Sequence, residues 1–271
     1  MSDLFQPGAD PAWLIAIVLF AIDYALVARS LGRQGHPVPR RAWLAWAAGL
    51  VVLAAALLSR IEHLATTSML SFHLLQNVML ADWAPPLLLL GLTGPMIAAI
   101  GHRLPMHRIG RPGIAISAWL AAWYVIHLPP VYDAALQSRA LLGVEHLVFL
   151  LTGLLFWWPD IVDGYLSARG RVVYLFAAMV AMMPLDIFIA LWPHGLYSFY
   201  ANTEKLGGIS VLTDQRIAGA GALVAETLVL GTALGFAVAR MLRAERRSSG
   251  NATAVGGTSR VPPTAVSMPP R

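Results

Sequence analysis

The eight histidines of this chain are the side chains best suited to bind a transition metal. Neutral imidazole is the commonest protein ligand for copper and zinc, and the chain has no cysteine to supply a thiolate. Five histidines stand where apolar segments begin or end: His63, His73, His127, His146 and His194. We expect His73, His127 and His146 to converge as metal ligands, with copper as the candidate ion. Because haem iron also accepts two imidazole ligands, haem is the alternative cofactor.

Polar side chains that accompany these histidines could orient the imidazoles. A metal-binding histidine normally uses its second nitrogen in a hydrogen bond that fixes the ring. The residues that we expect to orient the ligands are Gln76, Tyr132, Asp133, Glu145 and Asp214. The alternative for any single histidine is a side chain that only hydrogen-bonds a helix end at a membrane surface.

Five carboxylates fall inside apolar segments in which no lysine or arginine could pair with them: Asp23, Asp82, Glu145, Asp186 and Glu226. An acid in hydrocarbon is costly, which makes each of them a candidate functional group by default. The alternative is a protonated acid that is hydrogen-bonded inside the protein, as we expect for Asp23 and Glu226. In a second candidate function, Asp82, Asp186 and Glu226 are stations of a transporter for copper or protons.

The composition indicates that a membrane surrounds these residues. Hydrophobic residues make up 58% of the chain, charged residues 12%, and the mean hydropathy is +0.65. A soluble domain carries about 25% charged residues, so this chain has too few to cover a water-facing surface. The net charge of +5 does not indicate nucleic acid binding, because the arginines are scattered among short loops without interleaved aromatic residues. We predict an integral membrane protein in contact with a lipid bilayer.

Seven apolar runs approach the length needed to cross a hydrocarbon core of about 30 Å. They predict an all-α fold, a bundle of seven transmembrane helices in residues 1–242. The third run should be kinked at Pro85-Pro86 and ended by Gly91 and Gly94-Pro95. Residues 243–271 are rich in Ser, Thr, Gly and Pro and are expected to form a disordered cytoplasmic tail. The predicted spans are residues 12–31, 42–60, 69–91, 113–128, 141–158, 172–193 and 217–240.

The positive charges alternate from one connection to the next. The connections after the first, third and fifth spans, together with the C-terminal segment, hold 15 of the 19 lysines and arginines. Since cytoplasmic connections carry the excess of positive charge, the N-terminus should lie outside and the C-terminus in the cytoplasm. This orientation places the five histidines at the outer face. No phosphate loop, HExxH or GxSxG motif occurs, and no nucleophile–base pair stands out, so we predict a non-enzymatic role.

Five segments of the chain resemble four sequence blocks of one protein family. SFHLLQNVMLADWAPPLLLLG (71–91) resembles the signature helix of the CtaG-type, caa(3) oxidase assembly factors. HLPPVYDAAL (127–136), followed by EHLVFLLTGLLFWWP (145–159), is similar to the next block, and LYSFY (196–200) and DQRIAG (214–219) to the last two. The resemblance covers about residues 60–225. It implies a seven-helix protein of the bacterial inner membrane that helps cytochrome c oxidase to mature, with copper insertion as the candidate step.

The resemblance also implies partners, namely subunits of cytochrome c oxidase and a periplasmic copper donor. The chain departs from the family pattern at three places. Members commonly have a second histidine one turn after the first, where this chain has Asn77, and another histidine where it has Leu142. Ala222-Leu223 stands where the family usually has Met-Trp. The ligand set implied by the family is therefore incomplete in this chain.

Overall fold

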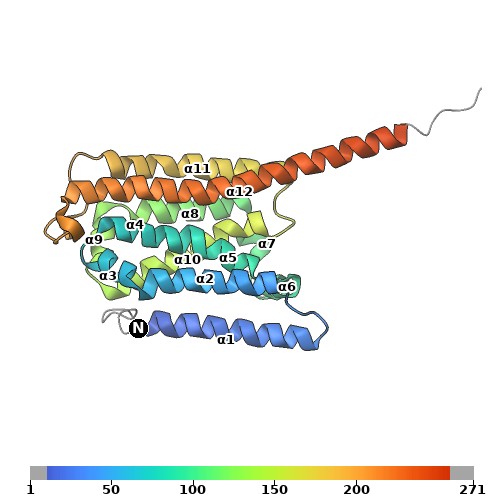
Figure 1. Ribbon diagram of the computed structural model, residues 1–271, viewed down its shortest axis with the longest axis horizontal. Coiled ribbons are helices and arrows are strands. Elements are labelled where there is room, and N and C mark those ends of the chain that lie inside the picture. Colours follow the sequence, from blue (N-terminus) through green and yellow to red (C-terminus); the bar gives the residue numbers. More distant parts are fainter. Residues whose placement is uncertain (1–10, 257–271) are drawn as a thin grey trace, which may run out of the picture.

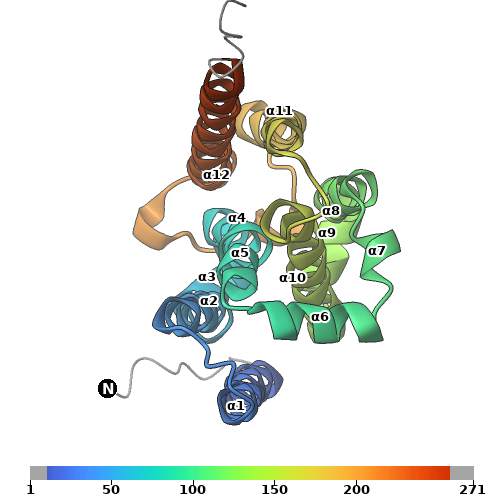
Figure 2. The same cartoon turned by 90° about the vertical axis from the view of Figure 1, so that its right-hand side faces the viewer.

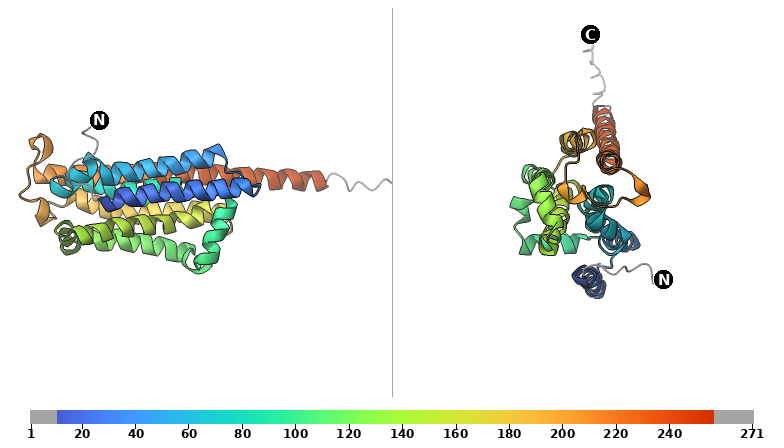
Figure 3. Two further views of the ribbon diagram at one scale, coloured as in Figure 1. Left: turned by 90° about the horizontal axis from the view of Figure 1, so that it is seen from below. Right: turned by 90° about the vertical axis from the view of Figure 1, so that its left-hand side faces the viewer.

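Helices make up the protein, joined by short connections. The computed structural model describes residues 11–256, and no strand occurs among them (Figure 1). The long helices run side by side along one axis, and shorter helices close the two ends of the bundle (Figures 1 and 3). The prediction of an all-α fold is confirmed.

Five helices are each long and apolar enough to cross a membrane. They correspond to the first, second, fifth, sixth and seventh predicted spans. α12 continues past the predicted boundary at residue 242, while residues 257–271 of the expected tail lie outside the described part of the chain. The five helices are α1 (Pro11–Arg33), α2 (Arg40–Leu58), α10 (Arg139–Ile161), α11 (Ala168–Leu191) and α12 (Val211–Gly256).

The third predicted span is one helical run with a widened turn near its middle. Its segments are α4 (Leu70–Val78), the π-helical turn η1 (Met79–Trp83) and α5 (Ala84–Leu90). The π turn widens the helix just before Pro85-Pro86, and the amide of Ala84 donates to the carbonyl of Met79, five residues back. Proline has no amide hydrogen and its ring crowds the preceding turn, so a widened turn accommodates the pair. After Gly91 the chain bends by 117° into α6 (Gly94–Arg103), as the sequence predicts.

The fourth predicted span is a bent pair as well. α8 (Pro112–Ile126) turns by 77° at His127 into α9 (Pro129–Leu136). The five long helices alone give five spans, and counting each bent pair as one further span gives seven. The count of seven therefore stays a prediction. The remaining short elements are α3 (Arg60–Thr67), α7 (Met106–Ile109), and the 3-10 turns η2 (Ser198–Tyr200) and η3 (Leu206–Gly208).

The helical run of α4, η1 and α5 forms the centre of the bundle. Viewed along the bundle, α4 and α5 lie between α2, α10 and α12, while α1 stands at the edge (Figure 2). Close packing of α10 on η1 depends on Gly153, where an added Cβ would overlap the carbonyl oxygen of Ala81 and lie 2.8 Å from Pro85 Cγ. Small residues allow such close approach between helices in lipid.

The two ends of the bundle differ in chemistry. One end carries the start of α1, together with α3, α9 and the connection between α11 and α12 (Figure 1). The opposite end carries the connections that the sequence analysis identifies as arginine-rich, and α6 lies across it (Figure 3). The helix directions therefore agree with the alternation of charge, while the side of the membrane that each end faces stays a prediction.

Replacing Gly153 by Ala should destabilise the fold, because the new methyl group meets backbone that cannot move without separating α10 from η1. Overpacking of this kind costs about 1–3 kcal/mol. Thermal unfolding in detergent measures the effect. Gly143→Ala, on the same helix with open space at its Cβ, is the matched control and should be neutral or slightly stabilising. Equal melting temperatures for the two variants would contradict this packing role.

The predicted orientation can be tested with reporter fusions. A reporter that is active only in the cytoplasm should give signal when fused after Arg247 and none when inserted at Glu204, because these positions lie at opposite ends of the bundle. The reverse pattern would place the N-terminus in the cytoplasm. Western blots of both fusions control for their amounts in the membrane.

Candidate functional site

His73 lies in the first turn of α4 and is fully buried. Its Nδ1 lies 3.0 Å from the hydroxyl of Tyr200, and its Nε2 lies 3.0 Å from Oε1 of Glu145. Tyr200 belongs to the connection between α11 and α12, and Glu145 to α10. His73 therefore joins three parts of the chain that are distant in sequence.

The partners of His73 determine where its protons lie. The hydroxyl of Tyr200 donates its hydrogen to the carbonyl of Ala65, and burial keeps the pKa of Tyr200 well above its usual value, so the hydroxyl stays protonated. The hydroxyl must then accept the hydrogen of His73 Nδ1. A further proton must lie between Nε2 and Glu145 Oε1, because two lone pairs would otherwise face each other. Both nitrogens of His73 are thus engaged.

His146 follows Glu145 on α10 and has unused hydrogen-bonding capacity. Its ring centroid lies 6.4 Å from that of His73 and 6.1 Å from the ring of Trp13 on α1. The side chain is 1% exposed, yet neither ring nitrogen has a hydrogen-bond partner among the described residues. A buried imidazole normally satisfies at least one nitrogen, so His146 is available for a ligand.

His127, at the bend between α8 and α9, is oriented as a ligand would be. Its Nδ1 donates to the carbonyl of Trp123 over 2.8 Å, and its ring stacks on the Trp123 indole. This bond selects the tautomer in which Nε2 carries a lone pair. Nε2 is buried and has no partner in the described chain. A backbone carbonyl on one nitrogen and an open lone pair on the other is the usual arrangement of a metal-binding histidine.

Tyr132 on α9 contacts two of the three histidines. Its ring centroid lies 4.9 Å from that of His73 and 5.3 Å from that of His127, and its hydroxyl is buried without a partner among the described residues. Glu145 Oε2 is likewise unpartnered. His73, His127, His146, Tyr132 and Glu145 are called the histidine cluster below.

The histidine cluster does not form a complete metal site as it stands. Within residues 11–256, no group of three or more His, Asp or Glu side chains is arranged to hold a metal ion. The structure brings His73 and His146 side by side and connects His73 to His127 through Tyr132. Several of its buried polar atoms have no partner among the described residues, which is rare in proteins.

Two of the predicted orienting residues support neighbouring elements rather than the imidazoles. Gln76 donates to the carbonyl of Ala56 over 2.8 Å and to Glu62, which ties α4 to α2 and α3. Asp133 accepts from the amides of Ser198 and Phe199 and from the Ser198 hydroxyl. These bonds hold the connection between α11 and α12 against α9.

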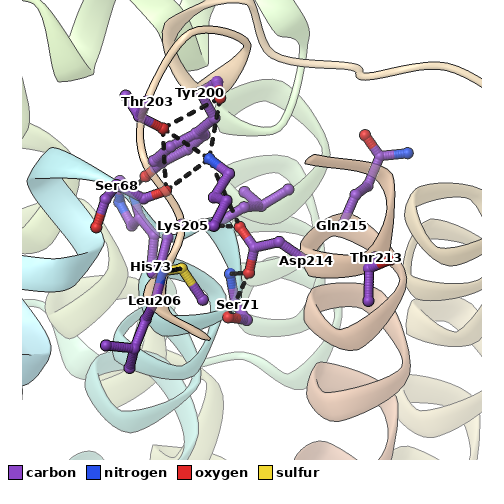
Figure 4. A network of polar contacts seen from close by, with 12 residues as sticks. Ser68, Ser71, His73, Tyr200, Thr203, Lys205, Leu206, Thr213, Asp214 and Gln215 are labelled. Carbon is purple, nitrogen blue, oxygen red and sulfur yellow. Dashed lines mark hydrogen bonds and ion pairs between the residues drawn. The ribbon is translucent and has the colours of Figure 1, made fainter. Parts of the chain in front are cut away.

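Asp214 holds the start of α4. One of its carboxylate oxygens accepts from the amide of Leu70 and the other from the amide and hydroxyl of Ser71, over 2.6–3.2 Å (Figure 4). A carboxylate in this position satisfies amides that the first turn of a helix leaves unpaired. His73 lies in that same turn, so Asp214 positions the histidine through the backbone.

Lys205 ties the connection between α11 and α12 to the same place. Its ammonium donates to the carbonyls of Ser68 and Tyr200 and to the Thr203 hydroxyl, and lies 4.0 Å from Asp214 (Figure 4). Burial lowers the pKa of Lys205, and the charge of Asp214 acts in the opposite direction. This network holds Tyr200 over His73.

The other two end histidines, His63 and His194, are exposed and remain outside the cluster. Tyr200, Tyr197 and Lys205 are site residues that sequence reasoning does not single out. The hydroxyl of Tyr197 donates to the carbonyl of His127, and its ring stacks on Tyr132 at 4.1 Å. Both tyrosines lie within the LYSFY segment, and the resemblance of that segment to the family is the one feature of the sequence that could have indicated them.

The acids in the spans gather elsewhere in the bundle. Asp82 on η1, Asp186 on α11 and Glu226 on α12 are each at most 2% exposed. The carboxyl groups of Asp186 and Glu226 are within hydrogen-bonding reach of each other, and Asp82 is close enough to interact with both. A hydrogen bond between two carboxyl groups requires a proton on one of them.

Replacing Lys205 by Met should loosen the connection over the histidine cluster, because its three hydrogen bonds are lost while the side-chain volume is kept. Each lost bond to a charged group is worth about 1.5–3 kcal/mol. Amide hydrogen exchange at Ala201 and Leu206 should accelerate. Glu204→Gln, at the exposed neighbouring position, is the control and should leave the exchange unchanged. Unchanged protection in the Lys205 variant would show that the network does not hold this segment.

Comparison with known proteins extends the resemblance. No curated protein and no solved structure matches the chain significantly. A family model described as cytochrome c oxidase caa3 assembly factor (Caa3_CtaG) matches residues 22–244. This range includes all five residues of the histidine cluster and most of the described chain. The chain therefore belongs to the Caa3_CtaG family of cytochrome c oxidase assembly factors.

Proposed function

We propose that this assembly factor handles copper for cytochrome c oxidase at the histidine cluster. The observation that carries the proposal is the set of buried imidazole nitrogens without partners, on His127 and His146, in a member of an oxidase assembly family. Imidazole suits copper, and the chain offers no thiolate. Copper is the cargo in this proposal, and the role is non-enzymatic.

His73 and Glu145 would take part by exchanging a proton for the ion. The proton between Nε2 and Oε1 gives the pair the same charge that a monovalent copper ion would give it. Since ligands must lose protons to bind a metal, copper entry would release that proton. A site that takes up one cation and releases another avoids leaving an uncompensated charge in a buried place.

The position of the cluster suits exchange with a partner outside the cell membrane. The charge alternation supports this part of the proposal, in which this end of the bundle faces outward from a bacterial inner membrane. A periplasmic copper donor would approach there, and the oxidase subunit that receives copper would lie in the same membrane. The connection between α11 and α12, held by Lys205 and Asp133, lies over the cluster and would have to move for transfer.

Replacing His127 or His146 by Ala should lower copper retention, because each change removes an available ligand nitrogen. We expect a loss of roughly tenfold or more in copper affinity. Metal analysis of protein purified from copper-supplemented membranes measures it. His63→Ala and His194→Ala, at exposed positions of the same end, are matched controls and should retain copper. Equal copper content in all four variants would contradict a site at the cluster.

Oxidase maturation in cells separates this function from transport. His73→Ala should lose most mature oxidase unless excess copper is supplied, whereas Asp82→Asn and Asp186→Asn should retain most of it. The reverse pattern would favour a transporter of copper or protons that uses Asp82, Asp186 and Glu226. A Soret band in the purified protein would instead indicate haem on the histidines.

A further inference from the structure

The first helix carries an acid that the rest of the described protein does not cover. Asp23 is the thirteenth residue of the 23-residue helix α1, so it lies near the middle of the span. Its side chain is exposed, and no hydrogen bond or ion pair joins it to residues 11–256. The expectation that Asp23 is hydrogen-bonded inside the protein is therefore wrong. At this depth the surroundings are hydrocarbon, where an unpartnered carboxyl group is costly.

An adjoining side of α1 attaches it to the bundle. Tyr24 and Ala28 are its buried residues, and the hydroxyl of Tyr24 donates to the carbonyl of Gly91 over 2.8 Å. The Tyr24 ring stacks on Trp46 of α2 with ring centroids 4.5 Å apart. Figure 2 shows α1 at the edge of the bundle, beyond α2. Since neighbouring residues of a helix point about 100° apart, Asp23 lies beside this attached side, on an exposed side of α1.

Large apolar side chains surround Asp23 on its open face. Leu19 and Leu26 lie four and three residues away, which places them beside Asp23 on the helix surface, and both are more than half exposed. Phe20 and Val27 flank it on the other side. An apolar face with one central acceptor is the pattern by which helices recognise each other in lipid, through packing and one polar bond.

We propose that this face of α1, centred on Asp23, docks a transmembrane helix of the client oxidase that presents a hydrogen-bond donor or a cation at the same depth. Only a helix within the membrane can place such a group there, because hydrocarbon offers no water to carry a polar loop. The proposal rests on the proposed function for the identity of the client. A second copy of this chain fits less well, because a twofold interface would bring one acid against another.

The helix that carries the docking face also reaches the histidine cluster. Trp13 lies two to three turns before Asp23 on α1, and its ring lies 6.1 Å from that of His146. A client helix on α1 would therefore stand next to the end of the bundle at which copper is handled. This arrangement would bring the receiving subunit close to the cargo.

Photo-crosslinking in membranes that produce the oxidase tests the proposal. A photoreactive residue at Leu19 or Leu26 of the full-length chain should form an adduct with a transmembrane helix of an oxidase subunit, identified by mass spectrometry. The matched control position is Phe176, which is similarly exposed on α11, away from α1 (Figure 2). Adducts with a second copy, adducts with lipid alone, or equal yields from Phe176 would overturn the proposal.

Variants of Asp23 complete the test. Asp23→Leu should lower the adduct yield by roughly fivefold, as expected for the loss of one polar bond between helices, and Asp23→Glu should retain it. Protein amount and copper retention should not change in either variant, because Asp23 contacts neither the core nor the histidine cluster. Normal yield from Asp23→Leu would overturn the docking role, while the copper proposal would still stand or fall with the histidine variants.

Discussion

A chain of hydrogen bonds through His73 holds the histidine cluster to the elements around it. It runs from the carbonyl of Ala65 through Tyr200 and His73 to Glu145, and so joins α3, the connection before α12, α4 and α10. In hydrocarbon each of these polar groups would be costly alone, and the chain satisfies most of them together. The same requirement explains the positions of Asp214 and Lys205, which satisfy amides at the start of α4 and a carbonyl at the end of α3.

The bend after α8 and the widened π turn of the third span place the functional residues within reach of one another. The bend after α8 frees His127 from a continuous helix, and it turns Tyr132 toward His73. The π turn before Pro85-Pro86 lets the third span run on through the bundle, and close contact with α10 at Gly153 keeps Glu145 next to α4. Proline and glycine residues outside the site therefore help to position it, because they determine the course and spacing of the helices that carry the site residues.

Asn77 is one of the departures of this chain from the family pattern, and it takes part in the polar contacts of the histidine cluster. It stands where the family commonly has a second histidine, and its amide donates to Glu145 Oε1, the oxygen that also faces His73. The position thus still contributes to the cluster, as a hydrogen-bond donor in place of a ligand. Because an amide nitrogen carries no lone pair available to a metal, the exchange narrows the candidate nitrogen ligands to the histidines.

The sequence alone determined the helical class, most span positions, the break after α5 and the family, because hydropathy, proline and short motifs act locally. It also selected His73, His127 and His146, but it could not show that His73 is engaged on both sides while His127 Nε2 and His146 are open. That difference arises because Tyr200 and Glu145 contact the ring nitrogens of His73, while the Trp123 carbonyl contacts only Nδ1 of His127. Such contacts depend on how the helices are directed in the bundle. Likewise, only the tertiary structure shows that Asp23 faces outward while Glu226 meets Asp186, since a helical pattern does not reveal which neighbour covers which face.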